Sequence, residues 1–225
     1  MLYFEGRGLS APENQPAQLE LFERRLPTRP YCTDRLESGL KIRPAKTAVR
    51  RRYIQADPPW LRAWLIFDVD RPTAAMAWDE AFLPEPAWVS QNPVNGHAHL
   101  AYGLDAPVLL GMHDRDRPKR YLAAVERAMR EQMTADPGYS GLITKNPPHK
   151  DWRVFWGAAE GYDLGYLAEW LPDLNKHKPR QAKAVEREGL GRNVSTFDHL
   201  RFHAYREVRL WRDTTLPPPG HLGKL

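Results

Sequence analysis

The stretch "WLIFDVD", Trp64 to Asp70, constrains the fold of this chain more than any other. Its apolar part predicts a buried strand over Ala63–Val69, whereas Asp is a poor strand residue. Side chains two residues apart in a strand point to the same face, so Asp68 and Asp70 should project together from its carboxyl end. Carboxylates this close repel each other unless a cation lies between them, and such oxygen ligands suit Mg²⁺ or Mn²⁺. The alternative is a solvent-facing strand end that carries two ordinary carboxylates.

The histidines of "GHAHLAYGL" form a second pattern of the same kind. His97 and His99 are two apart on a strand predicted over His97–Leu104, so both imidazoles share one face. A strand predicted over Ala87–Ser90 precedes it, and the Asn-Gly turn in "NPVNG" indicates a hairpin. If this hairpin neighbours the aspartate strand, a third carboxylate would complete a cage for two metal ions. The candidates for that third carboxylate are Asp163 and Asp151.

The charge of the chain is mildly basic, with 33 Lys and Arg residues against 28 Asp and Glu. This excess fits a polyanionic partner such as nucleic acid, and a solvated basic surface is the alternative. The segment Lys41–Tyr53 holds six basic residues and no acid. Within it, Arg50, Arg51 and Arg52 either form a solvated face or track the phosphates of a nucleic acid.

Other sequence features exclude several classes of protein. The single cysteine, Cys32, rules out an intrachain disulfide and favours a reducing, cytoplasmic location. No apolar run approaches the roughly 20 residues that span a bilayer, so we expect no membrane association. The sequence has neither the GxxxxGK[ST] loop of P-loop NTPases nor the GxGxxG of dinucleotide-binding folds.

The order of the remaining elements indicates an α/β or α+β core. Leu122, Val125, Met129 and Met133 recur at helical spacing and predict a helix over Pro118–Met133. The other segments that we expect to be regular are helices over Leu19–Leu26 and Arg71–Phe82, strands over Tyr139–Thr144 and Trp152–Gly157, and a helix after the capping-box residues Ser195 and Asp198.

Four motifs in this order resemble one known family. They are "FDVD", "GHAHLAYGL", "GLITKNPPHKDWRV" and "GRNVSTFDHLRFHAYREV". Together they resemble the replication initiator (Rep) proteins of the colicin-E-type plasmids, within the archaeo-eukaryotic primase superfamily, over residues 20–212. The resemblance implies a primase-polymerase catalytic core with a mixed, RRM-like sheet, followed by a small helical domain.

On this basis we expect the chain to divide into four segments. "LYFEG" near the start is typical of a protease-cleavable tag, so residues 1–6 are interpreted as a tag-derived scar. Residues 7–171 would form the catalytic core, 172–213 the connector and small helical domain, and 214–225 a flexible tail. Family members carry a further domain that binds the plasmid origin, and the chain is expected to be a fragment that stops before it.

The resemblance also implies roles for particular residues. Asp68, Asp70 and a third acid would hold two divalent ions, Mg²⁺ or Mn²⁺; the third acid is expected at Asp163, with Asp151 as the alternative. His99, or His97 in its place, would contact the phosphates of the incoming nucleotide.

Further residues would bind the substrates of that reaction. Lys145, Arg153 and the amide of Asn146 would bind the nucleotide, and Arg50, Arg51 and Arg52 would hold the template backbone. Tyr53, Trp152 and Trp156 are expected in the core, with base stacking as the alternative. The implied activity is templated synthesis of a short RNA primer from nucleoside triphosphates, at a plasmid origin, with a host DNA polymerase as partner.

Two other functions remain open from the residues. The His-Ala-His pattern is also typical of rolling-circle nicking endonucleases, in which two histidines bind one metal and a tyrosine attacks DNA. The nucleophile would then be Tyr121 or Tyr139. The third interpretation is a non-catalytic DNA-binding module that keeps a decayed site.

Overall fold

The computed structural model describes residues 16–111, 116–172 and 174. These residues form two antiparallel sheets with helices around them. In chain order the elements are α1 Ala17–Arg25, β1 Tyr31–Thr33, the 3-10 helix η1 Leu36–Ser38, β2 Lys41–Ile42, α2 Ala45–Ala48, β3 Tyr53–Ile54, β4 Leu61–Val69, the 3-10 helix η2 Ala74–Met76, α3 Ala77–Glu80, β5 Trp88–Gln91, β6 Ala98–Leu109, α4 Asp116–Gln132, β7 Thr144–Lys145, β8 Arg153–Trp156 and α5 Leu164–Glu169.

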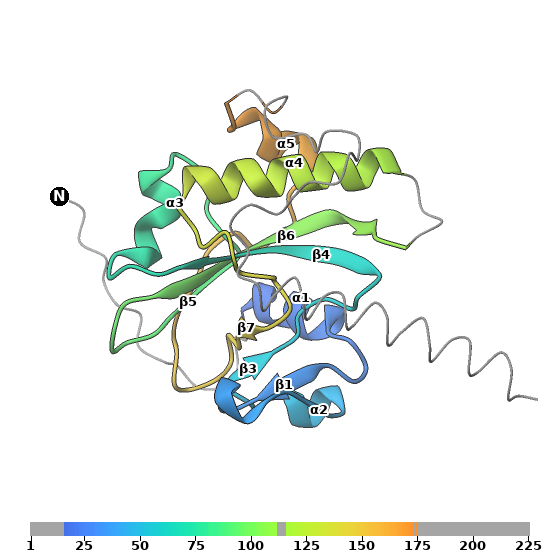
Figure 1. Cartoon of the computed structure of the whole chain (residues 1–225), viewed down its shortest axis with the longest axis vertical. Helices are drawn as coiled ribbons and strands as arrows, with labels where there is room; N and C mark the ends of the chain where they lie inside the picture. Colours follow the sequence, from blue (N-terminus) through green and yellow to red (C-terminus); the bar gives the residue numbers. More distant parts are fainter. Residues whose placement is uncertain (1–15, 112–115, 173, 175–225) are drawn as a thin grey trace, which may run out of the picture. The chain divides into compact units, whose positions relative to one another are not determined.

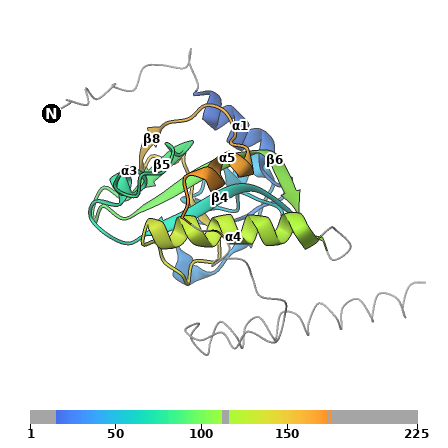
Figure 2. The same cartoon turned by 90° about the horizontal axis from the view of Figure 1, so that it is seen from above.

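The larger sheet has the strand order β4-β6-β5-β8, and the smaller one has the order β2-β1-β3-β7. Figure 1 shows α4 and α5 on one side of the larger sheet, and α1 with the smaller sheet on the other. The view from above shows α4 running along β4 and β6, with α5 beside it (Figure 2). The larger sheet is therefore covered on both faces.

Alternate residues of β4 feed two separate cores, as a strand buried on both faces requires. Leu65, Phe67 and Val69 belong to the core under α4, η2 and α3. Trp64 and Ile66 belong to the core shared with α1 and the smaller sheet. This alternation sends Asp68 toward the side of the smaller sheet.

The predicted α/β class is confirmed, and so is the hairpin, since β5 and β6 pair antiparallel and the Asn92 N–H donates to the carbonyl of His97 at 2.8 Å. The described residues form two sheets, not one, and their strand pairs are antiparallel, with an isolated parallel bridge between Leu104 and Tyr162. The mixed, RRM-like sheet was implied by the family resemblance. The second sheet was not expected, because the two short pairings of β3 leave almost no periodic signal in the sequence.

Two predicted elements are shorter than expected. The helix predicted over Arg71–Phe82 is reduced to η2 and α3, and it ends where Phe82 adopts a positive φ of 52°. The strand predicted over Tyr139–Thr144 begins only at Thr144, because Gly141 has a φ of 71° and the Tyr139 hydroxyl donates to the carbonyl of Ile143.

Several expectations lie outside the described residues. They are the tag-derived scar at 1–6, the flexible tail at 214–225, and the connector and small helical domain at 172–213 apart from residues 172 and 174. Among the helices that are described, none has the length and apolar character to cross a membrane.

The hairpin tip is fixed to the end of β4 by Gly96. Gly96 has a φ of 77°, and a Cβ at this position would overlap the backbone of Pro72. Gly39 has nearly the same φ, 76°, but a Cβ there would meet nothing within 4 Å. We expect Gly39→Ala to lower the free energy of unfolding by roughly 1–3 kcal/mol, because a φ of 76° with a ψ of 176° is a backbone conformation that is almost restricted to glycine.

Gly96→Ala adds the overlap with Pro72, so we expect its loss to be larger by at least about 1 kcal/mol. Urea unfolding of both variants measures the difference. Equal losses would show that the hairpin tip does not depend on this close approach.

Candidate active site

Three carboxylates gather where β4 ends. One ligand oxygen from each of Asp68, Asp70 and Asp136 lies within 4.8 Å of the others. Asp68 is on β4, Asp70 follows it directly, and Asp136 comes from the loop after α4. Like charges at this separation repel, so the group is stable only with cations or hydrogen-bond donors around it.

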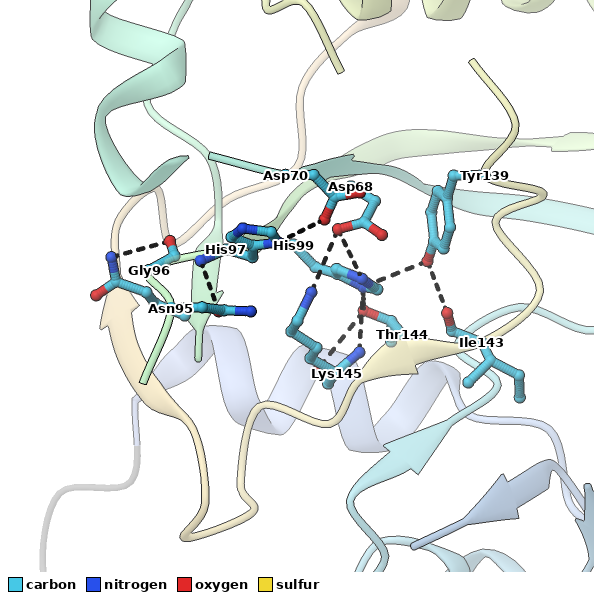
Figure 3. A network of polar contacts seen from close by, with 11 residues as sticks. Asp68, Asp70, Asn95, Gly96, His97, His99, Tyr139, Ile143, Thr144 and Lys145 are labelled. Atoms are coloured by element: carbon cyan, nitrogen blue, oxygen red, sulfur yellow. Dashed lines mark hydrogen bonds and ion pairs between the residues drawn. The ribbon is translucent and has the colours of Figure 1, made fainter. Parts of the chain in front are cut away.

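The register of β4 and β6 supplies the first donor. Asp68 pairs directly with His99, and such cross-strand partners point to the same face. The His99 Nε2 lies 3.2 Å from Asp68 Oδ1 (Figure 3). The prediction that these two side chains share one face is thus met by the geometry of the strand pair.

The tautomer of His99 follows from its other hydrogen bonds. The backbone N–H of Lys145 donates to His99 Nδ1 at 3.1 Å, and a backbone N–H can only donate. Nδ1 therefore carries no proton, and Nε2 donates to Asp68. The Thr144 hydroxyl lies 3.0 Å from Nδ1, and the ring of Tyr139 packs edge-on against the imidazole at 4.9 Å.

Lys145 supplies the second donor to Asp68. Its Nζ lies 3.2 Å from Asp68 Oδ1, the same oxygen that His99 binds, and the side chain is almost fully buried. Both donors use Oδ1, so Oδ2 remains for another ligand. Lys145 comes from β7 of the smaller sheet, so the site is built from both sheets (Figure 3).

These contacts set the charge states. Burial acts to raise the pKa of Asp68, but the hydrogen bond from His99 and the charge of Lys145 outweigh it and lower that pKa to about 2. Burial lowers the pKa of His99, against the opposing effect of Asp68, which agrees with a neutral imidazole. Burial also lowers the pKa of Lys145, while Asp68 acts to raise it. Asp68 is therefore ionised at neutral pH.

Asp136 is held beside Asp68 by the backbone. The N–H of Asp136 donates to the carbonyl of Asp68 at 2.8 Å. Just before it, α4 ends with Thr134 at a φ of 53° and the Ala135 N–H bonded to the carbonyl of Arg130, a Schellman-type ending. Arg71 donates to the carbonyl of Met133 at 2.8 Å and so ties this ending to the residues after Asp70.

The structure brings Asp136, not the predicted Asp163 or Asp151, to the aspartate pair. Asp163 is the N-cap of α5 and accepts from the N–H groups of Gly165 and Tyr166. Its neighbour Tyr162 bonds to Gly103, four residues along β6 from His99 and hence roughly 13 Å away.

Asp151 has a different partner. Its Oδ2 lies 3.1 Å from Arg52 Nε, and His149 is beside it at 3.9 Å. Its carboxylate is therefore part of a surface ion pair, outside the acidic group.

His97 joins the site, whereas two other predicted nucleotide-binding residues do not. The Nδ1 of His97 lies 2.9 Å from Asp70 Oδ1. Asn146 is fully buried and donates to the carbonyls of Val49 and Arg51. Its amide therefore stabilises the backbone of the turn before β3.

Arg153 lies on the opposite face of the larger sheet. It pairs with Gln91, which pairs with Ala98, and Ala98 belongs to the core under α4. Since cross-strand partners share a face, Arg153 points away from Asp68 and His99.

The three consecutive arginines have separate environments. Arg51 forms an ion pair with Asp34 at 2.6 Å, and Arg52 forms the pair with Asp151. Arg50 is exposed. The three arginines thus lie in the turn between α2 and β3, and two of their guanidinium groups already have an anionic partner.

Sequence reasoning missed Asp136, Thr144 and the packing of Tyr139 on His99. Asp136 lies in "TADPGY", where Asp-Pro-Gly indicates a turn after a helix. That signal predicts where the chain turns, but not that the turn meets β4. A helix predicted to cross back over the sheet, followed by an acid, would have been the available clue.

Comparison with known proteins gives the family. The model of the Replicase family matches residues 25–171, and the chain belongs to this family. Among solved structures, the chain is similar to the AEP domain of the primase-polymerase (PrimPol) of cyanophage S-2L, with a TM-score of 0.47 and 16% sequence identity over 70% of this chain and 97% of that one. No curated protein sequence matches the chain significantly.

The three carboxylates could hold a divalent metal ion, and this is testable without an activity assay. We expect Asp136→Asn to weaken Mn²⁺ binding at least about tenfold, because it removes a charged ligand. The matched control is Asp163→Asn, which keeps a good N-cap and should bind Mn²⁺ as the unaltered protein does. Isothermal titration calorimetry measures both. A loss in Asp163→Asn with none in Asp136→Asn would reverse the assignment.

Proposed function

We propose that this chain is a metal-dependent primase, which synthesises a short RNA primer from nucleoside triphosphates on a DNA template. The observation that carries the proposal is the acidic group of Asp68, Asp70 and Asp136 with a lysine and a histidine against it. Membership of the Replicase family and the resemblance of four sequence motifs to those of plasmid replication initiators support it.

The donor set fits hard divalent cations. Carboxylate oxygens are the ligands that Mg²⁺ and Mn²⁺ prefer, and Asp68, Asp70 and Asp136 would hold two such ions. When bound, the ions would activate the attacking 3′-hydroxyl and neutralise charge on the triphosphate. Ionised Asp68 needs no deprotonation before it binds a cation, because its pKa is about 2.

Lys145 and His99 would position the triphosphate. Lys145 offers three N–H donors that suit phosphate oxygens, and it is already held at the acidic group by its contact with Asp68. His99 donates through Nε2 at the same place, and Thr144 with the Lys145 backbone fixes its ring. These two residues would therefore meet the phosphates without rearrangement of the backbone.

The smaller sheet would hold the template. Residues 27–55 contain eight Lys and Arg residues and two acids, so their net charge is 8 − 2 = +6. The whole chain has a net charge of only +5. The basic residues exposed on this part of the structure are Arg29, Arg35, Lys41, Arg43, Lys46 and Arg50. A phosphate backbone is attracted to such a surface, and binding should weaken with salt.

In this proposal the primer serves initiation at a plasmid origin and is extended by a host DNA polymerase.

The alternative function, a rolling-circle nicking endonuclease, has less support. His97 and His99 turn to different carboxylates. The Tyr139 hydroxyl donates to Ile143, and burial raises its pKa well above the usual value, which disfavours a nucleophile. Tyr121 packs against the core under α4.

The test is nucleotide incorporation on single-stranded DNA with Mg²⁺ or Mn²⁺. We expect the double variant Asp68→Ala/Asp70→Ala and the single variant Asp136→Asn to fall to background, because each loses metal ligands. Asp163→Asn serves as the control and should keep full incorporation, and circular dichroism should show that all variants are folded.

Retained incorporation in the double variant would contradict the proposal. So would a covalent protein–DNA adduct formed without nucleotides, which is the product expected of a nickase and not of a primase.

A further inference from the structure

A half-buried tyrosine lies next to the acidic group on the smaller sheet. Tyr53 of β3 pairs directly with Lys145 of β7, so the two side chains leave the same face about 5 Å apart at Cβ. Lys145 in turn reaches Asp68 at 3.2 Å. The ring of Tyr53 is therefore one side chain away from the carboxylates, close enough for the charge of Asp68 to add to the effect of burial, which raises the pKa of Tyr53.

The ring is part of a small aromatic platform, defined here as Tyr53, Trp152 and Arg52. Tyr53 and Trp152 meet edge to face, with ring centroids 5.3 Å apart. The Arg52 guanidinium lies 4.8 Å from the Trp152 ring and 5.8 Å from the Tyr53 ring. Asp151 fixes that guanidinium with an ion pair at 3.1 Å.

The backbone under the platform is held from three directions. The carbonyl of Arg52 accepts from the indole N–H of Trp152 at 2.8 Å and from the backbone N–H of Asn146 at 2.9 Å. The Asn146 side chain donates to the carbonyls of Val49 and Arg51. Trp152 is 6% exposed, whereas Tyr53 keeps part of its surface in solvent. The platform is thus anchored behind and open at Tyr53.

We propose that Tyr53 is the contact surface for the nucleoside half of the incoming nucleoside triphosphate. This inference rests on the proposed function, since it takes the triphosphate to lie at Lys145 and the acidic group. A ligand with its phosphates there must extend its sugar and base to a neighbouring surface. The neighbour across the β3–β7 pair is an aromatic ring backed by a cation, and both attract a π-face.

This assignment explains why several residues outside the acidic group hold the platform in place. Asn146 and Asp151, which do not touch the acidic group, hold Arg52 in place and so act as positioning residues for Tyr53. A core role alone would explain Trp152, which is buried. It does not explain why Tyr53 remains partly exposed beside the only lysine in contact with Asp68 among the described residues.

The test compares two ligands that share the phosphates and differ in the nucleoside. In Mn²⁺, we expect Tyr53→Leu to weaken binding of ATP about 5- to 150-fold, the range for loss of one stacking contact. Binding of inorganic tripolyphosphate should change less than about twofold. Tyr53→Phe keeps the ring and should bind both ligands normally. The matched control, Tyr166→Leu, removes a partly exposed tyrosine of α5 and should change neither affinity.

The outcomes separate this inference from the proposed function. Unchanged ATP affinity in Tyr53→Leu, or an equal loss of affinity for ATP and tripolyphosphate, would contradict the proposed role of Tyr53. Neither result would contradict the proposed primase activity. Loss of affinity for single-stranded DNA alone would also contradict the role of Tyr53, because Tyr53 would then contact the template. If the unaltered protein binds neither ligand in Mn²⁺, both proposals fail.

Photo-cross-linking keeps the inference testable if Tyr53→Leu does not fold. With 8-azido-ATP and the unaltered chain, the label should be recovered in the tryptic peptide 53–62. Recovery confined to other peptides would contradict the placement of the base at Tyr53.

Discussion

The site depends on the register between β4 and β6, which sets Asp68 directly opposite His99. A shift of one residue would turn one of these side chains to the face under α4 and separate the pair. The register is well specified, because both faces of β4 are buried and its residues alternate between two cores. The hydrophobic packing of a long strand therefore positions a carboxylate and an imidazole at its end.

The other residues of the site come from parts of the chain that are distant in sequence from β4 and β6. The smaller sheet brings Thr144 and Lys145 to His99 and Asp68, and the end of α4 brings Asp136. Each link is a hydrogen bond or ion pair to β4 or β6, so the acidic group forms only when three layers are assembled. Asp68 is held by two donors on a single oxygen, whereas Asp70 is exposed and has His97 as its partner.

The sequence predicted the part of the site that has a local period, and missed the part that does not. Alternation along two strands predicts that Asp68 shares a face with Asp70 and that His97 shares a face with His99, and the choice of His99 comes from the family resemblance. Asp136 depends on a backbone hydrogen bond to Asp68, 68 positions earlier in the chain, which no local pattern encodes. The strand that carries Arg153 was also predicted from its local pattern. The face of the sheet to which the Arg153 side chain points, however, follows only from the pairing of β8 with β5. Asn146 was expected to bind the nucleotide through its amide, yet this amide donates to the carbonyls of Val49 and Arg51.

The proposed chemistry requires Asp68, Asp70 and Asp136 to form one metal centre. Anomalous diffraction from crystals soaked in Mn²⁺ and a non-hydrolysable nucleoside triphosphate tests it most directly. We expect manganese peaks in contact with these three carboxylates and phosphate density beside Lys145. Peaks at Asp163 or Asp151, or a carboxylate group without manganese at saturating concentration, would contradict it.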